Sequence, residues 1–211
     1  MQSVWRAFLR LFFRLLYNEL AWSYDLVAWL VSLGHWKAWG RTTLRHAAGE
    51  RVLELGHGPG HLLAALEEQG LRPVGLDLSP NMGHLARERL RRADIDVPLV
   101  RARAQALPFH DGCFDTLIAT FPTEFIIDPT TLREVTRTAR PEGRLVVVVG
   151  ARFDGQGIVA AFLSWLYRVT GQNEPPPDAL HAWLEHAELS PRIVREQVGQ
   201  TTMLLLVAER L

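Results

Sequence analysis

The sequence has little cysteine, no net charge and no long run of residues free of charge, and each shortage excludes a class of protein. Cys113 is the single cysteine in 211 residues, so no disulfide can form within the chain, and a reducing cytoplasmic compartment fits. Lys+Arg and Asp+Glu both number 23, so the net charge gives no general attraction to nucleic acid. A membrane-spanning helix is not expected, because arginines interrupt the apolar N-terminal stretch.

Clusters of metal-binding residues are also missing from the sequence. His57 and His61 lie four positions apart, but they flank Gly-Pro-Gly and do not follow the usual zinc spacings. We therefore predict no metal site, and we expect Cys113 to be a small apolar residue and not a nucleophile.

Apolar strands alternate with helices over the middle of the chain, which is typical of a parallel sheet covered on both faces. Strands are expected at 51–56, 73–78, 97–101, 114–119 and 144–150, and helices at 61–69, 80–92 and 130–139. A helix at 178–187 and an antiparallel hairpin of strands 192–198 and 201–209 should end the chain. The predicted fold is α/β: a Rossmann-like doubly wound sheet, mostly parallel, with a C-terminal antiparallel hairpin and additional N-terminal helices. We divide the chain into N-terminal amphipathic or lid helices, 1–45, and one compact cofactor-binding domain, 46–211.

The segment RVLELGHGPGH, residues 51–61, joins the first strand to the first helix of that domain through three glycines. In such sheets ligands bind at the carboxyl ends of the strands, and Gly56, Gly58 and Gly60 allow the backbone to approach one closely. Asp77 ends the next strand, where an acid can accept hydrogen bonds from both hydroxyls of a ribose. NAD(P)-binding proteins share this arrangement, but their fingerprint expects a third glycine where His61 stands.

Four motifs in order resemble a known family, the class I S-adenosylmethionine (SAM) dependent methyltransferases of the ubiquinone/menaquinone C-methyltransferase-like subgroup. VLELGHGPG resembles the glycine motif, and GLDLSPNM resembles the acidic loop that holds the ribose. LPFHDGCFD (107–115) and ARPEGRLVVV (139–148) resemble the segments that lead into the fourth and fifth strands. The expected hairpin agrees with this fold, whose seventh strand is antiparallel. Glu142 departs from the pattern, since the family usually has glycine there.

The resemblance implies a role for each residue of a cofactor site. Backbone amides at the start of the helix 61–69 would hold the methionine carboxylate, and the region of Glu54 and Gly56 would face the ammonium group. Leu78 and the loop 104–107 would enclose the adenine. Arg103 stands where relatives carry an acid for the adenine amino group, so Gln105 or the backbone must take that role. The candidate cofactor-binding residues are Glu54, Gly56, Gly58, Gly60, Asp77, Leu78, Ala104, Gln105 and Thr120.

No catalytic signature is expected, because methyl transfer needs a general base only when the acceptor carries a proton of high pKa. The segment Thr120–Phe125 follows the fourth strand and should line the acceptor side. Glu124, His35 and Tyr24 are the candidate bases, and the ordinary interpretation of Glu124 is a surface or helix-starting acid.

The first forty residues hint at the acceptor. Residues 4–16 form a basic amphipathic pattern with no acid before Glu19, which fits a helix on an anionic membrane surface. Five of the seven tryptophans lie in this region: Trp5, Trp22, Trp29, Trp36 and Trp39. Trp22, Trp29 and Trp36 recur every seven residues and should share one side of a helix, and 157–167 is a further apolar helix.

These features favour transfer of a methyl group to a hydrophobic small molecule, such as a quinone precursor or lipid, by a cytoplasmic protein that is peripheral on the membrane through residues 1–20. One alternative is a methyltransferase of a soluble metabolite, with the N-terminus as an ordinary lid. An alternative of another class is an NAD(P)-type oxidoreductase or a SAM-binding protein without activity. The acceptor, the methylated atom and the oligomeric state do not follow from the sequence.

Overall fold

The computed structural model describes residues 24–122, 124–154 and 189–210. Its helices are α2 (Tyr24–Ser32), α3 (Trp36–Arg41), η2 (Thr42–His46), α4 (His61–Glu67), α5 (Pro80–Arg92), η3 (Glu124–Ile127) and α6 (Pro129–Thr138). Its strands are β1 (Arg51–Leu55), β2 (Arg72–Asp77), β3 (Leu99–Arg101), β4 (Phe114–Thr120), β5 (Ala139–Phe153), β6 (Leu189–Val198) and β7 (Thr201–Arg210). The boundaries lie close to those predicted, because glycines, caps and apolar runs mark them in the sequence.

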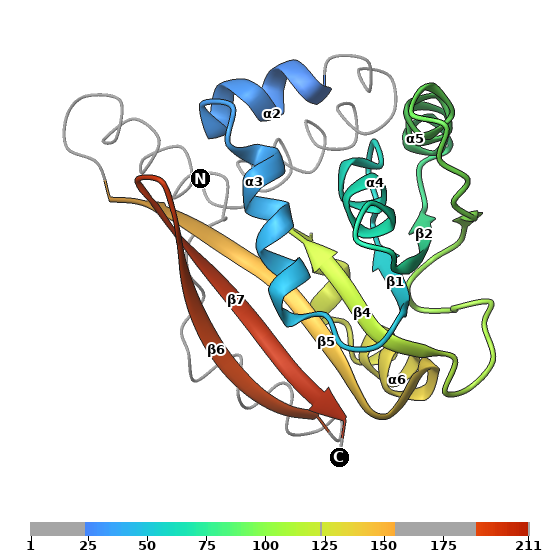
Figure 1. Ribbon diagram of the computed structural model, residues 1–211. Coiled ribbons are helices and arrows are strands. Elements are labelled where there is room, and N and C mark those ends of the chain that lie inside the picture. Colours follow the sequence, from blue (N-terminus) through green and yellow to red (C-terminus); the bar gives the residue numbers. More distant parts are fainter. Residues whose placement is uncertain (1–23, 123, 155–188, 211) are drawn as a thin grey trace, which may run out of the picture.

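The strands form one mixed sheet of seven, in the order β3-β2-β1-β4-β5-β7-β6 (Figure 1). The first five strands pair in parallel, whereas β7 runs antiparallel to both β5 and β6. The doubly wound sheet with a terminal antiparallel hairpin is therefore confirmed.

The Pro-Glu-Gly segment lies differently from the expectation. We predicted that the fifth strand begins at residue 144, but β5 already begins at Ala139, which pairs with Phe114. The register then shifts, so that Thr116 pairs with Arg144, and Glu142 takes a left-handed backbone with φ 62°. A residue with a Cβ rarely adopts this conformation, whereas glycine adopts it readily.

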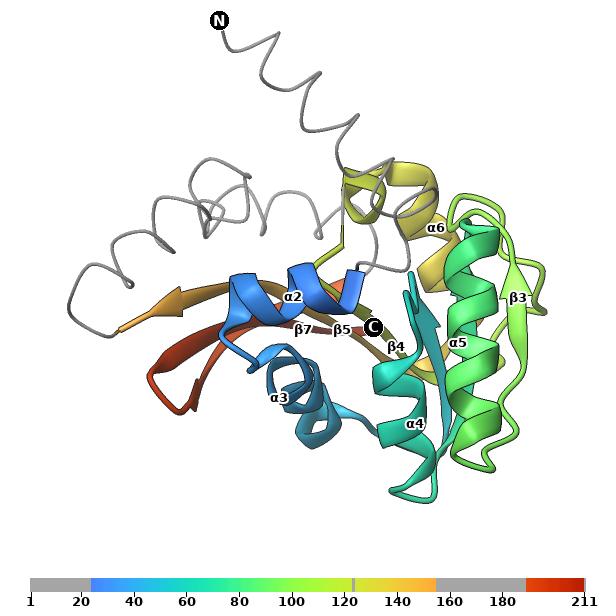
Figure 2. The ribbon, with the colours of Figure 1, turned by 90° about the horizontal axis from the view of Figure 1, so that it is seen from above.

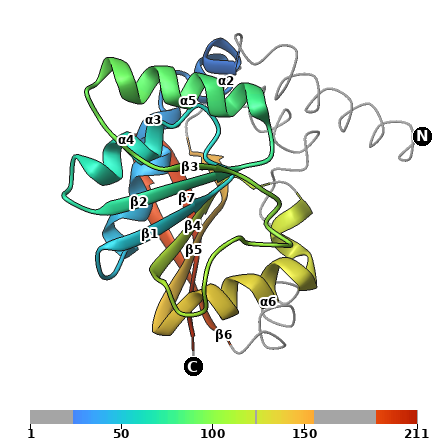
Figure 3. The same cartoon turned by 90° about the vertical axis from the view of Figure 1, so that its right-hand side faces the viewer.

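Helices cover both faces of the sheet. Leu132 and Val135 of α6 pack into one apolar cluster, together with Leu53 of β1. Trp39 of α3 and Leu66 of α4 join a second cluster on the other face. Figures 2 and 3 show α6 on one side of the strands and α3, α4 and α5 on the other. The central strands are thus buried on both sides, and the carboxyl edge of the sheet is left for a ligand.

The tryptophans at intervals of seven do not share one helix, so that prediction is wrong. The chain leaves α2 at Leu33 and Gly34, which have φ values of 50° and 82°, and starts again as α3. Trp29 is 59% exposed on α2, whereas Trp36 stacks on Phe121 with 4.6 Å between ring centroids. Two left-handed residues in succession end the helix that the periodicity alone would continue.

Several predictions fall outside the described residues: the amphipathic helix at 4–16, Trp5, Trp22, and the helices at 157–167 and 178–187. Among the helices that the structure describes, none has the length and apolar character needed to cross a membrane. The division of the chain at residue 45 stays a prediction.

Candidate functional site

The glycine loop leaves β1 at the carboxyl edge of the sheet and turns directly into α4. Gly56, Gly58 and Gly60 all have left-handed backbones, with φ values of 73°, 52° and 79°. A Cβ on Gly60 would lie 3.0 Å from that of Ala86, so this glycine lets the loop pack against α5. A Cβ on Gly58 would meet no protein atom within 4 Å, so the backbone there borders open space. This combination permits a ligand to approach the loop closely.

Asp77, at the end of β2, closes the loop. Its Oδ2 accepts from the Gly58 amide at 2.9 Å, and its Oδ1 accepts from the Ser79 amide at 2.8 Å. Each carboxylate oxygen has a second lone pair, so the residue can still accept two further hydrogen bonds. Ser79 in turn caps α5 by accepting from the Met82 amide, with Pro80 in the first turn, as the sequence predicted. Asp77 thus shapes the loop and can also accept ribose hydroxyls.

Glu54 is a buried acid beside the glycine loop. It lies on β1 just before the loop, is 2% exposed, and its Oε2 has no hydrogen-bond partner among the described residues. Burial raises the pKa of Glu54 well above its usual range, and the charge of nearby Asp77 raises this pKa further. A cation placed at this carboxyl would offset the cost of burying it.

His57 fills the space between the loop and α5. It is 4% exposed, and its Nδ1–H donates to the Gly58 carbonyl at 2.6 Å. Burial lowers the pKa of His57, while Asp77 and the carbonyl raise it. Gly75 of β2 makes room for the ring, because a Cβ there would lie 2.9 Å from His57 Cδ2. His57 therefore packs as a neutral side chain.

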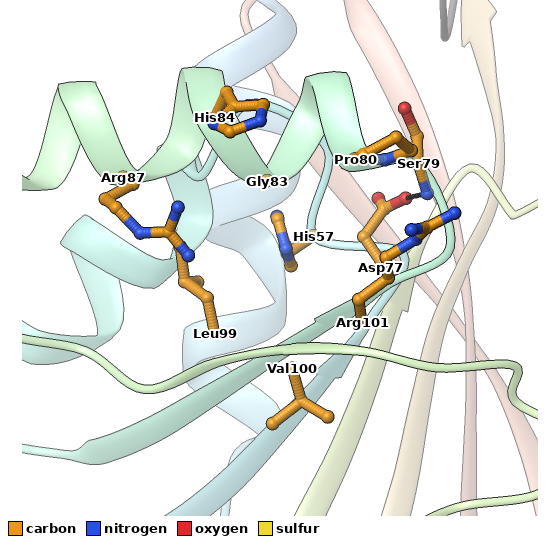
Figure 4. Close-up of a pocket in the computed structure, with 10 residues that line it drawn as sticks. All are labelled: His57, Asp77, Ser79, Pro80, Gly83, His84, Arg87, Leu99, Val100 and Arg101. Carbon is orange, nitrogen blue, oxygen red and sulfur yellow. Dashed lines mark hydrogen bonds between the residues drawn. The ribbon is translucent and has the colours of Figure 1, made fainter.

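A cavity of about 200 Å³ lies beside Asp77, between α5 and the β2–β3 edge (Figure 4). Arg87 of α5 and Arg101 of β3 reach it from opposite sides, with His57 between them. Arg101 Nε donates to the Leu78 carbonyl at 3.2 Å, and the Leu78 side chain is 55% exposed. Leu78 is thus held by its backbone and presents its side chain outward at the predicted adenine position.

The loop after β3 is fixed by α6. Gln105 Nε2 donates to Asp128 Oδ2 at 3.2 Å, and the Leu107 amide donates to Glu134 Oε2 at 2.7 Å. Arg137 binds Glu134 and donates to the Leu107 carbonyl at 3.0 Å. Ala104, in the same loop, is 7% exposed. The side-chain nitrogen of Gln105 donates to Asp128, so the side-chain carbonyl oxygen of Gln105 is the group that can accept a hydrogen bond from an adenine amino group.

Helix α2 is joined to the glycine loop by Asp25. His61 Nε2 donates to Asp25 Oδ1 at 3.0 Å, and Arg89 of α5 forms an ion pair with the other oxygen. Arg89 also donates to the Pro59 carbonyl within the loop. The hydrogen bond from His61 lowers the pKa of Asp25, and the Arg89 charge acts in the same direction. His61, which does not fit the dinucleotide fingerprint, therefore holds α2 against the loop.

Aromatic rings gather where β4 ends. Thr120 is followed by Phe121, whose backbone is left-handed with φ 47° and whose amide donates to the Val148 carbonyl at 3.0 Å. Phe121 stacks on Trp36, and Phe125 of η3 approaches Gly56, with its Cζ 3.6 Å from the position of a Cβ there. A strained backbone at the end of a strand is typical of functional sites. These rings border the acceptor side predicted for Thr120–Phe125.

The structure describes the surroundings of two of the three candidate bases. Tyr24 packs edge-on against Trp36, with 6.3 Å between ring centroids. His35 is exposed and lies beside the β6–β7 turn, with its Cε1 3.9 Å from the position of a Cβ on Gly199. Glu124 begins η3, and its side chain lies outside the described residues. No general base is assigned.

The described residues bring together no three potential metal ligands of the His, Cys, Asp and Glu types. Burial raises the pKa of the half-buried Cys113 thiol, which keeps it protonated and weakly nucleophilic.

Sequence reasoning missed the residues that support the loops: Asp25, Arg89, Asp128, Glu134 and Arg137. Ion pairs between distant elements leave no periodic signal, so most of these could not be found. Asp128 is the exception, since an acid followed by proline is a helix start, and it does cap α6 by accepting from the Thr130 amide at 2.8 Å.

Comparisons with known proteins agree with this geometry. A family profile described as "Methyltransferase domain" matches residues 53–147, from β1 into β5. The chain is 35% identical over 136 residues to a protein named demethylmenaquinone methyltransferase from Clavibacter sepedonicus, covering 63% of this chain and 55% of that protein. It is 32% identical over 193 residues to a protein of the same name from Mycolicibacterium vanbaalenii, covering 84% of this chain and 82% of that protein. The chain thus spans little more than half of the first relative and most of the second.

A solved structure shares the fold. The geranyl diphosphate C-methyltransferase of Streptomyces coelicolor A3(2), in complex with Mg²⁺, geranyl diphosphate and S-adenosylhomocysteine, superposes with a TM-score of 0.63. The match covers 82% of this chain and 79% of that one at 18% identity, which is a likeness of fold.

Proposed function

The chain belongs to the class I S-adenosylmethionine-dependent methyltransferases, in the subgroup of the quinone-biosynthesis enzymes, and from this we propose that it transfers a methyl group to a hydrophobic small molecule. The family membership removes the basis for the NAD(P)-type oxidoreductase. The methyl transfer itself, the identity of the acceptor and the binding partners of the chain are what we propose here.

The observation that carries the proposal is the buried Glu54 carboxyl beside the open glycine loop, whose Oε2 has no hydrogen-bond partner among the described residues. A buried carboxyl without a hydrogen bond destabilises a fold, so a partner of positive charge is expected. SAM carries an ammonium and a sulfonium group, and either would neutralise Glu54 on ionisation. The residues present therefore fit this cofactor.

The rest of the cofactor has a counterpart in the chain. Asp77 accepts the ribose hydroxyls with its remaining lone pairs, and Gly58 allows the backbone to approach. Leu78 and Ala104 enclose the adenine. The Gln105 carbonyl oxygen takes the adenine amino group in place of the acid that Arg103 replaces.

When bound, SAM supplies a methyl group on a sulfonium, which is already a good electrophile and leaving group. The protein has to hold the acceptor nucleophile in line with the S–CH₃ bond and exclude water, and such alignment contributes up to about 7–11 kcal/mol. Gly56, Thr120 and Phe125 stand where the cofactor and acceptor would meet. The electron pair of the broken C–S bond stays on sulfur, and any proton of the acceptor passes to water or to a group of the acceptor itself.

The proposed acceptor is an aromatic quinone precursor. Relatives that share most of the chain are named for demethylmenaquinone, and the aromatic rings of Trp36, Phe121 and Phe125 offer flat apolar surface at the acceptor side. Such an acceptor dissolves in membranes, so we place the protein in the cytoplasm, peripheral on the membrane through residues 1–20.

A soluble acceptor remains the second candidate, because Asp25 ties α2 to the glycine loop as a lid would be tied. A SAM-binding protein without activity is the third.

Purified protein is incubated with methyl-labelled SAM and either a short-chain demethylated quinol, a membrane lipid extract or a soluble metabolite extract. Asp77→Asn is the control, since it keeps the shape of the residue and weakens ribose binding. Label in the quinol or lipid that depends on wild-type protein supports the proposal. Label in the soluble extract alone would support a methyltransferase of a soluble metabolite. No label in any sample would favour a SAM-binding protein without activity.

A further inference from the structure

Helix α2 has two faces of opposite character. Its inner face is fixed: Ala28 and Ser32 are 7% and 0% exposed, and Asp25 binds His61 and Arg89 at the glycine loop. Its outer face, together with the residue that directly follows the helix, carries four large apolar side chains in contact with solvent. These are Leu26, Trp29, Leu30 and Leu33, with exposed fractions of 58%, 59%, 54% and 42%.

This outer face is a fixed surface and not a row of loose side chains. Ser32 Oγ donates to the Ala28 carbonyl at 2.6 Å and accepts from the Trp36 amide at 3.0 Å, which joins α2 to α3. Gly34 turns against the Trp29 indole, with Nε1 3.1 Å from the position of a Cβ there. Four of the six exposed large apolar side chains among the described residues thus lie on one short stretch of chain. A concentrated apolar patch of this kind marks an interaction surface.

The charge of the surrounding sequence identifies the partner. Residues 1–49 contain six basic residues and two acids, a net charge of +4 in a chain of net charge zero. The basic residues are Arg6, Arg10, Arg14, Lys37, Arg41 and Arg45, and the acids are Glu19 and Asp25. Asp25 is engaged at the glycine loop, and Arg41 and Arg45 pair with Glu68 and Glu196. Exposed leucines, a tryptophan and an excess of positive charge together match the boundary between anionic headgroups and acyl chains.

We infer that the outer face of α2 contacts the surface of an anionic phospholipid bilayer. The apolar side chains of this contact lie outside residues 1–20, whereas Arg6, Arg10 and Arg14 within that segment supply most of the basic charge outside the described ion pairs. Because Asp25 binds His61 directly and reaches Pro59 through Arg89, the same contact holds the glycine loop at the membrane. An acceptor dissolved in the bilayer then reaches the aromatic rings at the end of β4 without crossing water, which is the one step that rests on the proposed function.

The test measures co-sedimentation of the full chain with vesicles of phosphatidylglycerol and phosphatidylcholine. The double variant Leu26→Glu with Leu30→Glu should bind these vesicles at least tenfold more weakly than wild type. Ile127→Glu is the matched control, because Ile127 is 53% exposed but lies on η3, which packs with α6 on the other face of the sheet. This control should bind as wild type does. Brominated lipids should quench wild-type tryptophan fluorescence more than that of Trp29→Phe.

Three results would overturn the inference: no vesicle binding by wild type, equal binding by the double variant, or an equal loss in Ile127→Glu. A concentration-dependent dimer that the double variant abolishes, without vesicle binding, would assign the face to a second copy of the chain. Calorimetry with S-adenosylhomocysteine is run on each variant. Unchanged affinity shows that the variants fold, and absent binding in wild type contradicts the proposed function while leaving the vesicle result intact.

Discussion

Asp25 on α2 and Arg89 on α5 form an ion pair across the glycine loop, although 64 positions separate them. Arg89 also reaches the Pro59 carbonyl, and Asp25 also accepts from His61. Three elements that are distant in sequence are thereby connected at the predicted cofactor site. The position of α2 and the shape of the loop are thus coupled through two side chains.

Arg89→Gln tests this coupling. Asp25 is half exposed, so its ion pair should contribute less than about 1 kcal/mol to the free energy of unfolding, and Tm should change little. Hydrogen exchange in residues 24–32 should nevertheless rise, and S-adenosylhomocysteine should bind several-fold more weakly. Arg92→Gln is the control, since Arg92 lies on the same helix and pairs only with Glu88 among the described residues. Unchanged exchange in α2 would show that the contact is incidental.

Glu54→Gln should stabilise the protein without its cofactor and weaken cofactor binding. The folded-state pKa of Glu54 is raised, so between pH 4.5 and that raised value the folded chain binds more protons than the unfolded chain. The stability of wild type must therefore fall as pH rises through this window, and the variant must lose that slope. Urea unfolding at several pH values measures it.

The same variant should bind SAM about tenfold or more weakly, because hydrogen bonds to charged groups contribute about 1.5–3 kcal/mol. Glu50→Gln is the control, as Glu50 is exposed just before the same strand and pairs with Arg72. If the unfolding free energy depended on pH equally in wild type and Glu54→Gln, Glu54 would not be a buried acid with a raised pKa.

Gly58→Ala and Gly70→Ala form a matched pair. Both glycines have left-handed backbones, with φ values of 52° and 76°, and a Cβ on either would meet no protein atom within 4 Å. Each substitution should cost about 1–2 kcal/mol of stability through backbone strain. Only Gly58→Ala should also weaken cofactor binding, because Gly70 follows α4 at the opposite end of the strands. Equal binding by both variants would place the cofactor away from Gly58.

The sequence predicted the parts of this protein that depend on local rules. Apolar runs marked the strands, Ser79 marked the start of α5, and the three glycines with Asp77 marked the loop at the sheet edge. The break between α2 and α3 was missed because Leu33 takes a left-handed backbone that its residue type disfavours. Spacing alone extended the helix through Trp36.

The supporting contacts of the site could not be predicted, because they depend on where distant elements meet. Asp25 with His61 and Arg89, and Glu134 with Leu107, are pairs that only the packed fold brings together. Glu54 was predicted to lie near the cofactor, and this role stays a prediction, but the missing hydrogen-bond partner of its Oε2 among the described residues is visible only in the folded structure. The residues of the glycine loop could therefore be predicted from the sequence, whereas the contacts that hold the loop in place could not.

Arg137→Lys should weaken SAM binding through the loop that contains Ala104 and Leu107. The guanidinium donates to the Leu107 and Phe109 carbonyls, and its hydrogen bonds to Glu134 and Asp111 raise its pKa, so it stays charged. Lysine keeps the charge but cannot reproduce the fork that reaches both carbonyls. The side chain is 31% exposed, so we expect a loss of about 1–2 kcal/mol, or roughly tenfold in the dissociation constant. The KM for SAM should rise while kcat stays near wild type, because the proposed role of this loop is to enclose the adenine and not the methyl group. Arg133→Lys on the same helix, where Arg133 donates only to Thr130 among the described residues, should change neither constant. A fall in kcat with an unchanged KM would show that Arg137 acts on the transfer step and not on adenine binding.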